Sequence, residues 1–449
     1  MSSGNEVDIH EELAGAAVTP LHKMLGIVIT LITLFDGYDT FNPAYVIQYV
    51  RQPWGLLPSQ AGFLVSSGLI GFLFGAMGHG MIADRYGRRK TLLAGLWIVN
   101  VLTLLTAIFA TSFTSFCTLR FLTGLGLGVL LPLGTTFINE LAPPRVSNAF
   151  SLWGVTFGWS LGGVFAGLIG VFLTPTYGWQ ILYFVGAMSI PLTLLVHAVL
   201  PESPKFLAAS GRFDELRKLM VRLRPERGAV YANATFRTSD QATKNTIGAL
   251  LAPRYRRVSI TIWVTAFLTL FAIFGLVGWI PTVMIQRGES FASGFSYGAL
   301  MQATSFIGGL TLAMLADRGF APTPRLLSAW WIIGGIAVGS LVFVNSHAFN
   351  FAVVAIAGFC VIGAQHVLNN FTANSYETGF RASGVGMELG VGRVGGILGP
   401  FVIGFLQQMT GGQDAVFWAI GGAAVVAALV IGSLSVQGNA TEASVAPAE

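Results

Sequence analysis

The chain has 449 residues, of which 53% are hydrophobic and only 10% are charged, with a formal net charge of +5. Soluble domains carry roughly a quarter charged residues, so this composition excludes a soluble enzyme and places most of the chain in lipid. The 56 glycines favour close helix packing in a bilayer, where small residues let backbones approach one another.

Residues 1–22 form a polar segment ahead of the first apolar run. This segment contains four acidic residues, Glu6, Asp8, Glu11 and Glu12. It lacks the basic start of a cleavable signal peptide. We therefore expect a cytoplasmic N-terminal tail, followed by a first span that stays in the mature protein.

Apolar runs of about twenty residues, long enough to cross a bilayer, occur twelve times along the chain. Six lie within residues 23–200, near 24–49, 60–83, 91–111, 115–140, 150–173 and 180–200. Six more lie within residues 259–436, near 259–285, 295–316, 326–345, 349–374, 384–408 and 415–436. The pattern predicts an all-α membrane protein with twelve transmembrane helices, arranged as two bundles of six.

Residues 201–258 form a polar linker between the two bundles. Apolar residues recur at helical spacing between Phe206 and Leu223, namely Phe213, Leu216, Leu219, Met220 and Leu223. We expect a cytoplasmic amphipathic helix that lies along the membrane surface, and a solvated linker with incidental charge is the alternative. The C-terminal tail, residues 437–449, is expected to be disordered.

Basic residues are distributed unevenly between alternate loops. If the N-terminus is cytoplasmic, the inside loops hold Lys23, the basic cluster at 85–90 and the basic linker, whereas the outside loops hold only Arg51 and Arg287. The positive-inside rule then places both termini in the cytoplasm. The net charge is accordingly a topological signal and does not indicate nucleic-acid binding.

Short motifs recur in the two halves at similar spacing. Ile82-Ala83-Asp84-Arg85 ends the second span and Leu315-Ala316-Asp317-Arg318 ends the eighth, while Arg145 falls opposite Arg381. Two similar bundles suit alternating access, in which the halves rock about a central site. A duplicated scaffold that does not transport is the alternative.

The loop after the second span carries the most specific motif. Residues Gly80-Met81-Ile82-Ala83-Asp84-Arg85-Tyr86-Gly87-Arg88-Arg89-Lys90 resemble the G-x-x-x-D-R-x-G-R-R signature of the major facilitator superfamily. Arg120-x-x-x-Gly124-x-x-x-Gly128, the glycines Gly154, Gly158 and Gly162, and Pro201-Glu202-Ser203-Pro204 also resemble motifs of that superfamily. The resemblance implies the major facilitator fold, with two pseudo-symmetric six-helix bundles.

Two further stretches are similar to the aromatic acid:proton symporter family, which contains transporters of the 4-hydroxybenzoate and benzoate type. They are Asp36-Gly37-Tyr38-Asp39, and Arg381-Ala382-Ser383-Gly384-Val385-Gly386 leading into Gly390-Val391-Gly392-Arg393 and Gly399-Pro400. The resemblance implies a multi-pass protein of the bacterial inner membrane that imports benzoate-like carboxylates with protons for aromatic catabolism. Glu377 and Glu388 depart from the pattern of this family.

Asp36 and Asp39 are the leading candidates for proton coupling. Charged residues inside a span are costly and are functional candidates by default. The two aspartates are three residues apart in the first span, so they share a helix face with Asn42. A permanent ion pair of one aspartate with Arg120 or Arg393 is the alternative, and Asp39 is the preferred candidate for coupling or substrate contact.

Arg120 and Arg393 are the basic residues placed well inside spans, one in each half. A guanidinium stays charged and can bind a carboxylate in a bidentate manner. We expect Arg393 to bind the substrate anion and Arg120 to take part in proton coupling. A structural ion pair is the alternative for each.

Polar and aromatic residues in the spans are candidates for contact with the ring of the substrate. His366 and Asn370, with Gln365 and Asn369, cluster in the tenth span, and interhelical hydrogen bonding is the alternative role for them. Tyr38 and Asn42 complete the predicted substrate-binding set, and Phe274 is one of several aromatic residues that could stack on a ring. Trp279 is expected to be an anchor at the membrane interface.

Charged residues at the cytoplasmic ends of the spans are expected to act as a gate. The resemblance assigns this role most clearly to Asp84, and the proposed pairs are Glu140 with Arg145 and Glu377 with Arg381. The full gating set is Gly80, Asp84, Arg85, Gly87, Arg88, Arg89, Glu140, Arg145, Asp317, Arg318 and Arg381. Topological anchoring is the alternative for the arginines.

The sequence as a whole predicts a secondary active transporter that imports an aromatic carboxylate by proton symport, with no cofactor besides the proton gradient and no metal. A proton-driven exporter, or a symporter of a dicarboxylate or sugar acid, is the nearest alternative, and a membrane sensor is a second. The expected partners are a small organic anion, protons and lipid, and a monomer is expected.

Overall fold

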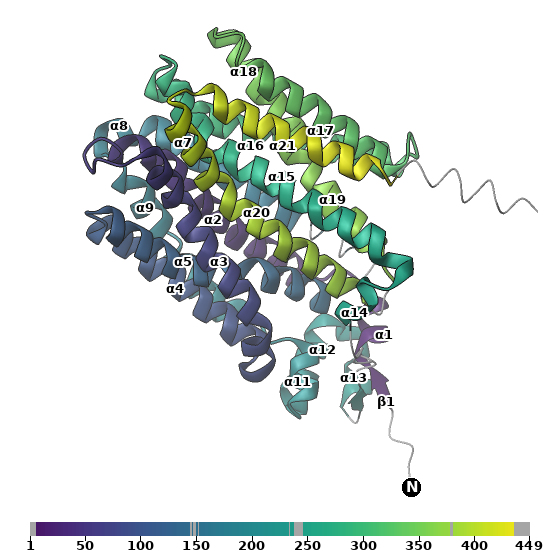
Figure 1. Cartoon of the computed structure of the whole chain (residues 1–449). Coiled ribbons are helices and arrows are strands. Elements are labelled where there is room, and N and C mark those ends of the chain that lie inside the picture. The colour runs from purple at the N-terminus through teal and green to yellow at the C-terminus, as the bar shows by residue number, and fades with distance from the viewer. Residues whose placement is uncertain are drawn as a thin grey trace, which may run out of the picture.

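The computed structural model describes residues 6–434 apart from 144–145, 147–149, 151, 233, 238–245 and 378–379. Long, roughly aligned helices make up most of the molecule (Figure 1). Those of the first half are α2 (Pro20–Val50), α3 (Pro58–Tyr86), α4 (Arg88–Phe109), α5 (Phe113–Leu141), a π-helical turn (Leu152–Phe157) continued by α7 (Gly158–Phe172), and α9 (Gln180–Ala187) followed by α10 (Ile190–Val199).

The second half repeats this arrangement. It consists of α15 (Pro253–Gln286), α16 (Phe291–Asp317), α17 (Thr323–Ser340), α18 (His347–Ala357) continued through a π-helical turn (Gly358–Ile362) into α19 (Gly363–Asn374), α20 (Arg381–Thr410) and α21 (Asp414–Gly432). Among the described residues, eleven helical segments are long and apolar enough to cross a membrane. The remaining expected span is the 18-residue α17, so the prediction of twelve spanning helices in two bundles is confirmed.

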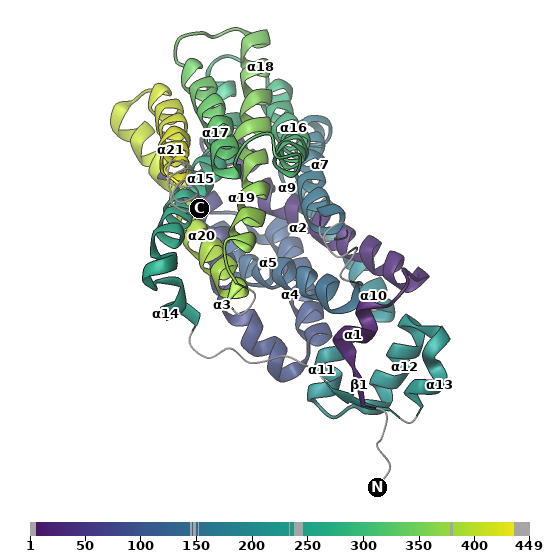
Figure 2. The same cartoon turned by 90° about the vertical axis from the view of Figure 1, so that its right-hand side faces the viewer.

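Short elements connect and flank the bundles. They are α1 (Ile9–Ala14), α8 (Thr174–Tyr177), α11 (Pro204–Ala209), α12 (Phe213–Leu223), a 3-10 turn (Pro225–Arg227), α13 (Gly228–Tyr231) and α14 (Thr246–Leu250). Two three-residue strands, β1 (Glu6–Asp8) and β2 (Thr235–Arg237), pair in parallel, with Val7 opposite Phe236. Figures 1 and 2 show α11–α13 gathered with β1 at one end of the molecule, which we call the linker end; the opposite end is called the outer end.

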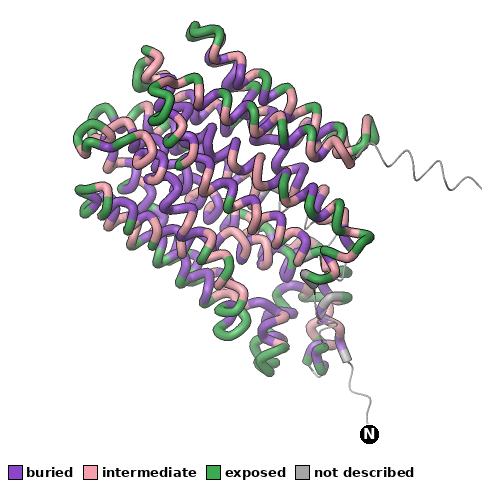
Figure 3. Tube along the Cα trace, viewed as in Figure 1, coloured by how far each residue is buried: buried purple, intermediate pink, exposed green. Residues whose placement is uncertain are grey.

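Glycines allow helices within a bundle to touch backbone to backbone. A Cβ atom at Gly124 or Gly128 of α5 would collide with the carbonyl oxygen of Gly68 or Phe72 of α3. Buried positions accordingly run through the centre of both bundles, and exposed positions gather at the helix ends and on the outer faces (Figure 3). The glycine-rich composition therefore serves packing, as the sequence indicates.

The two bundles touch each other closely at the outer end. A Cβ atom at Gly62 of α3 would collide with the carbonyl oxygen of Pro400 in α20, and the Ser66 hydroxyl donates to the carbonyl oxygen of Ile397 at 2.6 Å. Tyr45 of α2 packs edge-on against Phe295 of α16, with ring centroids 5.3 Å apart. Residues at the outer end are thus interlocked across the bundles.

At the linker end the same helices lack this close packing. A Cβ atom at Gly78 or Gly80 of α3, or at Gly386 or Gly390 of α20, would meet no described atom within 4 Å. The close contacts between α3 and α20 therefore lie at the outer end, and the four glycines nearer the linker end are unpacked.

The predicted amphipathic helix is present, but its apolar face does not lie on the membrane surface. Two helices, α11 and α12, replace one, because Gly211 between them has a φ of +70°. The apolar face of α12, including Leu216 and Met220, is buried in a cluster with Ile9 and Leu13 of α1. Protein therefore covers this face, and the amphipathic pattern reports that contact instead of lipid.

Ion pairs hold the N-terminal segment against the linker. Glu12 pairs with Arg224 and Arg227, each at 2.9 Å, and accepts a hydrogen bond from the Tyr231 hydroxyl at 2.6 Å. The predicted tail at 1–22 is therefore ordered over much of its length, whereas residues 437–449 lie outside the described residues.

Trp279 is a second correction. Its side chain is fully buried, and its indole N–H donates to the carbonyl oxygen of Pro400 at 2.8 Å. It belongs to the core of the second bundle, and no interfacial anchor is formed at this position.

Candidate functional site

Asp39 and Arg120 form an ion pair inside the first bundle. The Arg120 guanidinium donates to Asp39 Oδ2 and to the Asp39 carbonyl oxygen, both at 2.9 Å. The Thr103 hydroxyl donates to Asp39 Oδ1 at 3.3 Å, and Arg120 lies 5.6 Å from the centre of the Tyr183 ring. Both charged side chains are buried. Helices α2, α4, α5 and α9 therefore meet around one neutralised pair of charges.

Asp36 lies one turn before Asp39 on α2 but has different surroundings. Its side chain is 1% exposed, and neither carboxylate oxygen has a hydrogen-bond partner among the described residues. Its opposite charge is Arg393 of the second bundle, with which it interacts electrostatically. The two aspartates thus have separate arginines, and Asp36 is the one whose interaction crosses between the bundles.

Arg393 lies on α20 just below the region where α20 is interlocked with α3. Its guanidinium is 4.0 Å from the ring centre of Phe72 on α3 and 5.8 Å from that of Phe274 on α15. The residue is partly exposed, in contrast to Arg120. A fixed cation flanked by aromatic rings from both halves can bind a carboxylate while the rings contact an apolar body.

Glu388 adds a second carboxylate on the same helix as Arg393. Its side chain is fully buried, and its Oε1 accepts a hydrogen bond from Gln365 of α19 at 3.2 Å. Gln365 also accepts a hydrogen bond from the Thr269 hydroxyl of α15 at 2.7 Å. When the Asn369 amide is oriented with its nitrogen toward acceptors, it donates to Glu388 Oε1 at 3.0 Å. Glu388 is thus held by amides and interacts electrostatically with Arg393.

Four residues of the predicted substrate-binding set have contacts with residues other than Arg393. Tyr38 and Asn42 are buried and donate to the carbonyl oxygen of Leu182, at 2.8 and 3.5 Å. Their positions are those of packing residues in the first bundle. A Cβ atom at Gly309 of α16 would lie 3.1 Å from His366 Cδ2, so the His366 ring packs against α16.

Asn370 is the fourth such residue, and it lies on an exposed part of α19. Its side-chain oxygen accepts a hydrogen bond from Asn374 at 3.5 Å. Asn369, one position earlier, is the amide that the structure places beside Glu388. Asp39, predicted for both coupling and substrate contact, is enclosed by its ion pair with Arg120.

The gating candidates of the first half lie around the turn between α3 and α4. Arg88 pairs with Asp84 at 3.1 Å and approaches Glu140 of α5 at 3.7 Å. The backbone N–H of Arg89 donates to Glu202 at 2.9 Å. Gly87 makes the turn with a φ of +103°, and a Cβ atom there would collide with the Glu202 carboxylate. Glu140 also accepts a hydrogen bond from Ser203, so these charges tie α3, α4 and α5 to the start of the linker.

The remaining gating candidates have different surroundings from those predicted. Glu377 pairs with Arg254 at 3.2 Å, so the expected pair with Arg381 is not the one that the structure shows. The side chains exposed at the linker end are Arg85, Asp317, Arg318 and Arg381. Gly80 is partly exposed, and a Cβ atom there would meet no described atom within 4 Å. Arg145 lies outside the described residues.

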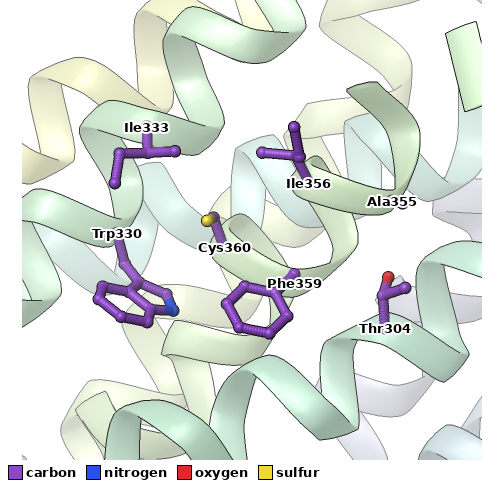
Figure 4. Close-up of a pocket in the computed structure, with 7 residues that line it drawn as sticks. All are labelled: Thr304, Trp330, Ile333, Ala355, Ile356, Phe359 and Cys360. Atoms are coloured by element: carbon purple, nitrogen blue, oxygen red, sulfur yellow. The ribbon is translucent and has the colours of Figure 1, made fainter. Parts of the chain in front are cut away.

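A hollow of about 410 Å³ lies between α16, α17 and the α18–α19 segment (Figure 4). Its lining is almost entirely apolar, with Trp330, Ile333, Ile356 and Phe359 around Cys360. It contains none of the charged residues described above. Within the described part of the chain, no group of three or more His, Cys, Asp or Glu residues could hold a metal ion.

The sequence analysis missed two residues of the site. Phe72 gave no signal, because an aromatic residue in an apolar span is most often a packing residue. Glu388 did give a signal, as a carboxylate inside a span that departs from the family pattern, but no role was predicted for it. Its amide partners come from α19 and become visible only in the fold.

Comparison with known proteins finds a matching family, relatives in sequence and a solved structure of similar fold. The family profile of the Major Facilitator Superfamily matches residues 27–387. A gallate transporter of Pseudomonas putida is 31% identical over 430 residues, covering 95% of this chain and 94% of the relative. The 4-hydroxybenzoate transporter PcaK of Pseudomonas aeruginosa is 31% identical over 406 residues, covering 88% of each chain. The partially occluded, inward-open xylose transporter XylE of E. coli superimposes with a TM-score of 0.72 at 18% identity, covering 90% of this chain and 95% of that one.

Proposed function

The chain belongs to the Major Facilitator Superfamily and is a transporter, and from this premise we propose that it imports an aromatic carboxylate together with protons. The proposed site is the space between the bundles around Arg393. The relatives named for gallate and 4-hydroxybenzoate favour a substrate with a carboxylate on an aromatic ring.

The position of Arg393 is the observation that carries this proposal. The residue is partly exposed, and its guanidinium lies against Phe72 of one bundle and Phe274 of the other. A benzoate-like anion would pair its carboxylate with the guanidinium and pack its ring against these aromatic side chains. Arg120 cannot take this role in the present conformation, because Asp39 already occupies its guanidinium.

Asp36 is the proposed proton-coupling residue. An ionised carboxylate that is buried without hydrogen bonds is unfavourable, and Arg393 is its compensating charge. A substrate anion on Arg393 would remove that compensation and favour protonation of Asp36. Substrate and proton would thus bind together. Asp39 and Arg120, the coupling residues expected beside it, support the site as a structural pair.

The arrangement of the bundles supports alternating access in the inner membrane. The outer end is interlocked and the glycines of α3 and α20 nearer the linker end are unpacked, which fits an inward-facing state if the linker and both termini are cytoplasmic. The basic residues of the linker-end loops favour that orientation. The charges around Asp84, Arg88 and Glu140 would form part of the inner gate when the halves close there.

The test is uptake of labelled benzoate, 4-hydroxybenzoate and protocatechuate into cells that express the chain, with and without a protonophore. We expect accumulation that the protonophore abolishes, and loss of accumulation in Arg393→Ala. Arg222→Ala, an exposed change on α12, is the matched control and should accumulate normally. Absence of aromatic acid accumulation with the protein confirmed in the membrane would overturn the proposal and favour an exporter, or a carrier of a dicarboxylate or sugar acid.

A further inference from the structure

One oxygen of the Glu388 carboxylate accepts hydrogen bonds, and the other has no hydrogen-bond partner among the described residues. Oε1 faces the amides of Gln365 and Asn369, whereas Oε2 is buried and has no hydrogen-bond partner among the described residues. A permanently ionised carboxylate normally fills both oxygens with donors when it is buried. The free Oε2 is therefore a place where a proton can bind without breaking an existing hydrogen bond.

Arg393 is shared by two carboxylates of different mobility. Asp36 belongs to the first bundle, so its distance from Arg393 changes whenever the bundles move relative to each other. Glu388 lies five residues before Arg393 on α20, a rise of roughly 7.5 Å along the helix, so it stays near Arg393 in every conformation. Two other groups, near the end of α19, also interact with the Glu388 carboxylate: the Thr372 side chain through hydrogen bonding and Tyr376 electrostatically.

We propose that Glu388 is an internal anion that competes with the substrate carboxylate for Arg393 and takes up a proton when the substrate binds. In the empty carrier, ionised Glu388 compensates Arg393. When the substrate carboxylate pairs with Arg393, one proton from solution binds to Glu388 Oε2. Release of the substrate returns that proton to solution. This inference rests on the proposed binding of an anionic substrate at Arg393.

Two consequences separate this role from a structural one. Removing the competing charge should tighten substrate binding, whereas loss of a structural residue would weaken it. The empty carrier would then have only Asp36, on the other bundle, to compensate Arg393, so net uptake should slow while exchange of substrate for substrate continues. A lower KM and a lower maximal rate of net uptake are therefore expected together.

The experiment measures binding of 4-hydroxybenzoate to the purified full-length chain in lipid nanodiscs, from mildly acidic to mildly alkaline pH. Wild-type affinity should fall as the pH rises, because ionised Glu388 competes more strongly. Glu388→Gln should bind roughly five-fold more tightly or better at alkaline pH, the lower end of coupling between linked sites, and should show a shallower pH dependence. Substrate counterflow in proteoliposomes should be retained.

Two further variants control for structural effects. Glu388→Asp keeps a titratable group and should keep the wild-type direction of pH dependence, and Glu215→Gln, on the exposed surface of α12, should behave as the wild type. A Glu388→Gln protein with unchanged or weaker affinity and the wild-type pH slope would overturn this inference alone. A wild-type protein that binds no aromatic acid would overturn the proposed function, and this inference with it.

Discussion

Arg120 and Asp39 form a two-point contact that closes the centre of the first bundle. One guanidinium nitrogen meets the Asp39 carboxylate and a second meets the Asp39 carbonyl oxygen, each at 2.9 Å. Asp36, three residues earlier, has no such contact. The same short stretch of α2 therefore supplies one structural and one available carboxylate, and the two can be separated by experiment.

Asp39→Asn should destabilise the protein without a specific effect on coupling. It would leave the Arg120 guanidinium buried without an opposite charge, which typically costs about 3–5 kcal/mol. A clear fall in the melting temperature of the detergent-solubilised protein is expected. Thr103→Val, which removes only a 3.3 Å hydrogen bond to the same carboxylate, is the matched control and should cost about 1 kcal/mol. A melting temperature of Asp39→Asn equal to that of the wild type would contradict a structural role for the pair.

Asp36→Asn should have the opposite profile. It removes a buried charge that lacks hydrogen bonds, so the melting temperature should stay near that of the wild type. Proton-driven accumulation should fall, because the proton that Asp36 would take up when the substrate binds Arg393 is no longer carried. Counterflow, which requires no net proton movement, should remain. Accumulation at the wild-type level would remove Asp36 from the coupling mechanism.

The helical framework could be predicted because it depends on local properties of the chain. Runs of apolar residues of sufficient length define spans wherever they occur, and the positions of the predicted spans match the helices closely. The assignment of the linker helix failed for a physical reason. An amphipathic helix can cover a membrane or another protein segment equally well, and here Leu216 and Met220 are buried in an apolar cluster of the protein itself.

The site was predicted only in part, because its partners come from different helices. Asp36 and Asp39 share a helix face, so the sequence could not tell which one meets Arg120 and which one approaches Arg393. Arg393 was recognised as a cation inside a span. The contacts of Phe72 with Arg393, and of the amides with Glu388, depend on how α3 and α19 pack against α20. The spacing of residues along the sequence carries no information on that packing.

Crosslinking the outer end should stop transport. Ser59 of α3 and Gln408 of α20 lie on opposite bundles, with Ser59 Oγ 2.7 Å from Gln408 Oε1. A short thiol-specific crosslinker on Ser59→Cys/Gln408→Cys, in a chain with Cys117 and Cys360 replaced by alanine, would hold this end closed. We expect uptake to fall to background and to recover when a cleavable crosslinker is cut. Either single cysteine variant should be unaffected by the reagent, and full uptake by the crosslinked protein would show that the outer end need not open.

A cluster around Glu289, in the loop between α15 and α16, should make the stability of the folded protein depend on pH under acidic conditions. His347 and the Tyr297 hydroxyl each contact the Glu289 carboxylate at 2.8 Å, and Asn350 donates to it at 3.4 Å. Burial acts to raise the pKa of Glu289, but these hydrogen bonds, led by that of His347, outweigh it and lower the pKa. The ionised carboxylate therefore stabilises the fold.

The pH window of this effect follows from the direction of the shift. Because the pKa of Glu289 is lower in the folded protein than its unfolded value of about 4.3, the stabilisation is fully present above that pH. It is lost as the pH falls through the folded pKa. Glu289→Gln should cost about 1.5–3 kcal/mol at neutral pH, the usual range for hydrogen bonds to a charged group, and less in acid.

Melting temperatures of the wild type and Glu289→Gln, compared from neutral to strongly acidic pH, check this prediction. The two curves should be separated at neutral pH and converge in acid, since the protonated wild-type carboxyl then resembles the amide. Asp214→Asn, whose side chain is 91% exposed, is the matched control and should follow the wild type throughout. A gap between the curves that stays constant down to the lowest pH would show that Glu289 acts through packing, because packing does not depend on its charge.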